Sequence, residues 1–127
     1  MRSLVFSSLL FIIPLCVAVK NKLPILASVF GLLVLTSVVN HAKIYRPISL
    51  YVDQIVVRTV TSVLMICAFV VVAPYSPWLG ISAGLCGVLA GYIYLNKNKM
   101  SHHVMLHVVG AVGFTLFVLG YSQIVKK

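Results

Sequence analysis

Long apolar stretches alternate with short polar connections along the chain, and this pattern predicts hydrophobic helices. The stretches cover residues 4–19, 23–41, 48–73, 79–95 and 103–125. A helix needs about 20 apolar residues to cross the hydrocarbon core of a bilayer, and most of these stretches approach or exceed that length. Lysines and prolines between them are typical of loops at a membrane surface. The pattern therefore predicts an all-α fold, a polytopic transmembrane bundle of about five helices.

The polar connections are too short to form a second folding unit, so residues 1–127 are expected to be a single integral membrane domain. The first apolar stretch allows two interpretations. Arg2, followed by an apolar run that contains Ala18 near its end, resembles a secretory signal peptide. Pro14 inside the run and Lys20 directly after it favour a first helix that is retained. Cleavage of residues 1–19 is the alternative.

Composition supports a membrane protein. Apolar residues make up 61% of the chain and charged residues only 9%, whereas a soluble domain carries about 25% charged residues to cover its surface. The net charge of +9 comes from ten Lys and Arg against a single acid. These basic residues fall in small clusters between the apolar stretches, which favours lipid headgroups as partners and argues against nucleic acid. The sequence does not indicate which membrane holds the protein.

Four glycines repeat along the fourth apolar stretch, at Gly80, Gly84, Gly87 and Gly91. Small residues at this spacing let a neighbouring helix approach closely in lipid, where packing drives helix association. The spacing favours tight packing within the chain. Helix–helix self-association between two copies, through the same glycines, is the alternative.

Polar residues suited to chemistry occur near the ends of three predicted helices. Ser37 and His41 are four residues apart and share a helix face, as do His103 and His107. Asp53, the only acid, lies near the start of the third helix. Because successive helices cross in alternating directions, all five residues are expected at the same side of the membrane.

These residue types together favour a metal-assisted hydrolase. Three neutral imidazoles with an open fourth position can bind Zn²⁺, which lowers the pKa of a bound water to about 7. A nearby carboxylate such as Asp53 can accept a proton from that water, and a hydroxyl such as Ser37 can donate a hydrogen bond to a developing oxyanion.

The order of these residues resembles the CREST superfamily of membrane hydrolases, which includes alkaline ceramidases, progestin and adiponectin receptors and hemolysin-III-like proteins. The matching motifs are Ser37-x3-His41, Asp53 and His103-x3-His107. The resemblance implies that the three histidines hold zinc, that Asp53 activates water and that Ser37 supports the site. It also implies hydrolysis of a lipid amide bond by a reduced version of the fold, since family members typically have seven transmembrane helices.

Two other functions fit the same residues. A non-catalytic scaffold or assembly protein would use this polar cluster only to tie its helices together. A small proton-linked transporter would use Asp53 and the histidines as a proton relay. Taken singly, the residues also have ordinary structural roles, since histidine is favourable at helix C-termini and serine bonds to helix backbone.

Overall fold

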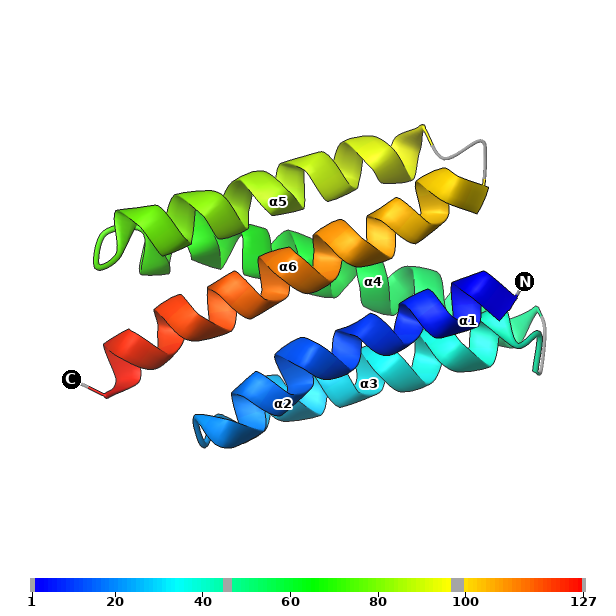
Figure 1. Ribbon diagram of the computed structural model, residues 1–127, viewed down its shortest axis with the longest axis horizontal. Helices are drawn as coiled ribbons and strands as arrows, with labels where there is room; N and C mark the ends of the chain where they lie inside the picture. The colour runs from blue at the N-terminus through cyan, green and yellow to red at the C-terminus, as the bar shows by residue number, and fades with distance from the viewer. Residues whose placement is uncertain (1, 45–46, 97–99, 127) are drawn as a thin grey trace.

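The computed structural model describes residues 2–44, 47–96 and 100–126, and every regular element within these ranges is a helix. The elements are α1 (Arg2–Ser8), η1 (Leu9–Phe11), α2 (Ile12–Lys20), α3 (Pro24–His41), α4 (Ile48–Cys67), η2 (Ala68–Val72), α5 (Pro77–Leu95) and α6 (Met100–Val125). They form five rods, because α1, η1 and α2 follow one another without a break, as do α4 and η2 (Figure 1). The predicted bundle of about five helices is confirmed.

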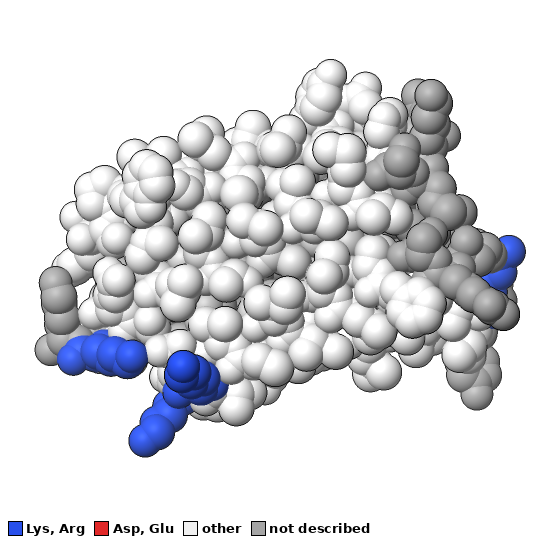
Figure 2. All heavy atoms as spheres, viewed as in Figure 1, with Lys and Arg blue, Asp and Glu red and all other residues white. Residues whose placement is uncertain are grey.

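Four of the five rods are long and apolar enough to cross a membrane, and the first, Val5–Lys20, is a shorter apolar helix. Large apolar side chains cover the outside of the bundle, and Ile25, Trp78 and Leu95 are each about four-fifths exposed. On the face shown in Figure 2, the visible Lys and Arg side chains lie at the two ends, with an uncharged band between them. This distribution is that of a multi-pass membrane protein.

The helix boundaries follow local chemistry. Pro24 and Pro77 occupy the first turns of α3 and α5, where the missing proline N–H has no helical partner to lose. The helix predicted from residue 79 therefore begins earlier, at Pro77. The helix predicted from residue 103 begins at Met100, because a polar first turn is invisible to a pattern of apolar residues. After α3, Lys43 adopts a left-handed φ of 61° and turns the chain away from the helix axis.

The centre of the bundle is α6, which contacts the first rod, α4, η2 and α5. In its membrane-length segment 44% of residues are buried, more than in any of the other three long helices. Phe114 of α6 packs between Phe11 and Phe30, with ring centroids 5.9 and 5.4 Å apart. Figure 1 shows α6 running between α1, α2 and α3 on one side and α5 on the other. Residues at the start of α6 therefore meet several helices at once.

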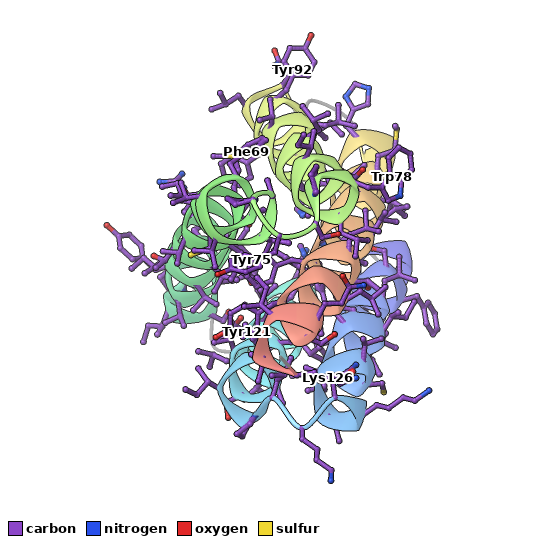
Figure 3. All side chains as sticks on the ribbon, turned by 90° about the vertical axis from the view of Figure 1, so that its left-hand side faces the viewer. Phe69, Tyr75, Trp78, Tyr92, Tyr121 and Lys126 are labelled. Carbon is purple, nitrogen blue, oxygen red and sulfur yellow. The ribbon has the colours of Figure 1, made fainter. Side chains whose placement is uncertain are left out.

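Three of the four repeated glycines pack against the neighbouring rod of the same chain. A Cβ at Gly80 would lie 2.3 Å from the backbone nitrogen of Ala73, and one at Gly84 would lie 2.4 Å from the ring of Phe69. Figure 3 shows Phe69 beside α5, whereas Trp78 and Tyr92 project from the bundle. Gly87 meets Met65 in the same way, but a Cβ at Gly91 would meet nothing within 4 Å. Self-association through this stripe stays a prediction.

The rod of α4 and η2 ends in a π-helical turn that the sequence did not predict. The N–H of Ala73 donates to the carbonyl of Ala68 over 2.9 Å, a bond that spans five residues. Gly80 lies against both of these residues, so the absence of its side chain lets α5 approach the widened turn. This contact fixes α5 close to α4 at the end of the bundle opposite the polar residues described next.

Candidate metal centre

Three histidines meet at the end of the bundle where α3 ends and α6 begins. His41 is the last residue of α3, and His103 and His107 lie one turn apart in the first turns of α6. Figure 1 shows these two helix ends at the same end of the molecule, together with the N-terminus. The prediction that His41, His103 and His107 lie on the same side of the bundle is therefore confirmed.

The three imidazole rings are mutually adjacent. Ring centroids are 4.7 Å apart for His41 and His103, 5.1 Å for His41 and His107, and 4.9 Å for His103 and His107. Each ring offers one nitrogen such that all three nitrogens lie within 4.8 Å of one another. His41 and His107 are buried and His103 is half-buried.

This geometry fits a tetrahedral metal ion. Nitrogens bound to one zinc at about 2.0–2.1 Å lie roughly 3.4 Å apart. The observed separations of up to 4.8 Å are therefore within small side-chain rotations of a common ligand position. Neutral imidazole is a preferred ligand of zinc, copper, iron and nickel, so the donor set alone leaves the identity of the metal open.

Asp53 lies in the same cavity as the histidines. The cavity has a volume of about 180 Å³ and its lining includes Asp53 and all three imidazoles. The Nδ2 of Asn40 donates a 2.9 Å hydrogen bond to Oδ2 of Asp53. Asn40 directly precedes His41, so the last turn of α3 positions both a candidate ligand and the carboxylate. Asp53 is 7% exposed, which keeps its charge in a region with little water.

Ser37 is buried one turn before His41 but is not among the described residues that line this cavity. Its Oγ lies 2.8 Å from Oγ of Ser8. The structure thus brings four of the five predicted site residues around one cavity and places the fifth beside the first rod. The catalytic role of Ser37 stays a prediction.

Side chains of the first rod contact His107 directly, and the sequence did not predict these contacts. Ser7 Oγ lies 2.6 Å from Nδ1 of His107, and both side chains are buried. Phe11, one turn further along, packs its ring edge-on against the same imidazole at a centroid distance of 5.5 Å. The paired serines Ser7 and Ser8 inside an apolar run were the available signal. Retention of the first helix stays a prediction.

Asn40 and Tyr94 were also missed as cavity residues. Asn40 stands directly before His41 in the sequence. The sequence does not show that the amide of Asn40 points towards the carboxylate of Asp53. Tyr94 lies in the last turns of α5 and accepts a 3.0 Å hydrogen bond from Nε of Arg58.

Comparison with protein-family models, curated proteins and solved structures gives no match for this chain. The resemblance to the CREST superfamily therefore rests on the motif residues alone. The chain is a multi-pass helical protein with a histidine triad that can hold a metal ion.

Proposed function

We propose that the chain is a zinc-dependent membrane hydrolase that cleaves an amide bond in a lipid. One observation carries the proposal: three imidazoles from opposite halves of the sequence converge on a cavity that also contains the only carboxylate. Ionisable side chains within a membrane cost free energy, so a cluster of them indicates a functional site.

Three histidines supply a ligand set that leaves one tetrahedral position open, as in catalytic zinc sites. When bound, zinc supplies Lewis acidity that polarises a carbonyl or a water oxygen. Because Nδ1 of His107 is directed at Ser7, we assign Nε2 as its ligand atom, with the Nδ1–H donating to the serine hydroxyl. Ser7 then fixes the orientation of the ring.

Asp53 is assigned as the base that accepts the proton from the attacking water. Its carboxylate lines the cavity, and the amide of Asn40 holds one of its oxygens. Burial strengthens the interaction of this charge with any cation in the cavity, since the local dielectric constant is low. The apolar remainder of the cavity wall, which includes Leu33 and Phe114, favours a substrate with hydrocarbon character over a soluble one.

The test is metal content together with activity in purified protein. Wild type is expected to retain about one equivalent of zinc in detergent and to hydrolyse an N-acyl lipid. His103→Ala is expected to lose both. His102→Ala provides a matched control, because His102 is an exposed neighbour on the same helix and is not part of the triad. Equal zinc retention in wild type and His103→Ala would overturn the ligand assignment.

A non-catalytic scaffold is the second candidate, and a specific observation favours it. Three hydrogen bonds between side chains join different helices near the triad: Ser7 to His107, Ser8 to Ser37 and Asn40 to Asp53. Such bonds contribute to helix association in membranes without any ion. A protein that folds and functions in cells, and that contains no zinc and cleaves no lipid, would support this candidate.

A further inference from the structure

Arg58 is a cation in the middle of α4, away from every other described basic side chain. The others, Lys20, Lys22, Lys43 and Lys126, lie at helix ends or in loops. A charged side chain at the centre of a membrane helix is rare and typically faces a functional cavity. Arg58 is exposed on the surface of the bundle, and its position requires an explanation.

Among the described residues, Arg58 makes a hydrogen bond and a cation–π contact with the same tyrosine. Its Nε donates to the hydroxyl of Tyr94 over 3.0 Å, and its Cζ lies 5.3 Å from the centre of the same ring. Tyr94 lies in the last turn of α5, at the end of the bundle that holds the histidines. The guanidinium is therefore drawn from the middle of α4 towards the membrane surface at that end.

No acidic side chain of this protein neutralises the guanidinium of Arg58 at the surface. The sequence contains one acid, Asp53, and its carboxylate lies in the metal cavity, where Asn40 bonds to it. An anion that neutralises Arg58 must therefore come from another molecule. The planar guanidinium is suited to bidentate binding of a phosphate.

A groove of about 470 Å³ lies between α4 and α5, and Arg58 is part of its wall. Its wall includes Val57, Thr61, Ser62, Gly91 and Tyr94. Gly91 leaves room in this wall, since a Cβ there would meet nothing within 4 Å.

The groove and the metal cavity are neighbours. Val57, Thr61 and Tyr94 line both spaces, so these side chains form the wall between the groove and the cavity. A molecule in the groove thus lies directly beside the candidate metal centre.

We propose that this groove binds an acyl chain of an anionic phospholipid, with the phosphate on the guanidinium of Arg58. The apolar wall accepts the hydrocarbon chain, and the guanidinium favours a phosphate whose charge is not neutralised by a cationic group in the same headgroup, as choline does in phosphatidylcholine. Cleavage of an amide-linked acyl chain in such a lipid rests on the proposed function, but binding does not. The substrate class of the proposed hydrolase is then an anionic lipid whose amide-linked acyl chain lies close to a phosphate.

The test is lipid binding to purified protein, measured by native mass spectrometry with dioleoyl phosphatidylglycerol, dioleoyl phosphatidylcholine and oleic acid as probes. Wild type is expected to bind phosphatidylglycerol about tenfold more tightly than phosphatidylcholine. Arg58→Gln is expected to lose this preference, and Arg58→Lys to keep part of it. Lys43→Gln is the matched control, because it removes a charge at the same end outside the groove.

Filling the groove gives an independent readout. Gly91→Phe is expected to weaken binding of both phospholipids at least severalfold, because the new ring occupies the space of the acyl chain. Gly31→Phe is its control: a Cβ there also meets nothing within 4 Å, but Gly31 lies on α3 outside the groove.

The same titration in His103→Ala separates this proposal from the zinc site. Retained preference for phosphatidylglycerol without zinc supports the groove even if the metal assignment fails. Equal binding of the two phospholipids by wild type, or an unchanged preference in Arg58→Gln, would overturn the proposal. Preferential binding of oleic acid would also overturn it, since the anion would then be a carboxylate.

Discussion

Replacing Ser7 with alanine removes the hydrogen bond that joins the first rod to His107. The two atoms are 2.6 Å apart, and the side chains are 7% and 4% exposed, so water has little access to replace the hydroxyl. A buried polar group that loses its partner costs about 1–3 kcal/mol. Loss of an outer partner of a ligating histidine typically weakens metal binding by about 10–100-fold. That range corresponds to roughly 1.4–2.7 kcal/mol, which agrees with the hydrogen-bond figure.

We therefore expect Ser7→Ala to raise the zinc Kd by about 10–100-fold, measured by competition with a chromophoric chelator in detergent. Ser7→Thr keeps a hydroxyl and is expected to restore most of the affinity. Ser8→Ala is the matched control, because Ser8 is the next residue, is fully buried and bonds to Ser37. It is expected to lower stability without changing the zinc Kd.

Cobalt substitution adds a spectroscopic readout that a merely structural role would not move. The visible bands of bound Co²⁺ report ligand orientation, and we expect them to shift in Ser7→Ala and to stay unchanged in Ser8→Ala. Equal zinc affinities for wild type and Ser7→Ala would refute the role of Ser7 as the residue that orients His107. Equal losses in the two alanine variants would refute it as well, because they would trace to packing of the first rod.

Three further outcomes follow from the structure. Asp53→Asn keeps the shape and the place beside Asn40 but removes the base, so hydrolysis of an N-acyl lipid should fall by about 100-fold or more with zinc content unchanged. Removal of zinc by a chelator should lower the midpoint of thermal unfolding, since free zinc at 100 times Kd stabilises by about 2.7 kcal/mol, and His103→Ala should show no such response. Gly80→Ala should destabilise the protein by about 1–3 kcal/mol in detergent unfolding, because its Cβ would lie 2.3 Å from backbone. Gly91→Ala, where the space is open, should instead be neutral or stabilising by up to about 1 kcal/mol.

The sequence was sufficient to predict the bundle because apolar length is the property that lipid selects. Residues 23–41 and 48–73 appear as α3 and as α4 with η2, within a residue or so at each end. The π-turn at 68–72 was out of reach of the hydropathy pattern, and it lies against Gly80 of another rod. A contact between rods leaves no mark in the hydropathy of either one.

The candidate site was partly predictable for a similar reason. Alternating crossings fix which helix ends share a side of the membrane, and this correctly grouped His41 with His103 and His107. Alternation says nothing about how each helix is rotated about its axis. The orientation of the first rod, which brings Ser7 to His107 and Ser8 to Ser37, depends on the packing of Phe11 against α6. Periodicity in a uniformly apolar segment does not encode that rotation.

The candidate ligands are distributed unevenly along the chain, with one on α3 and two on α6. During synthesis α3 leaves the ribosome well before α6, so a partly inserted chain presents a single imidazole and binds an ion weakly. Under the proposed function, tight metal loading must therefore follow insertion of α6, and the ion would lock the completed bundle. A nascent chain stalled before residue 103 would be metal-free, which gives a cell a chemical distinction between unfinished and finished copies.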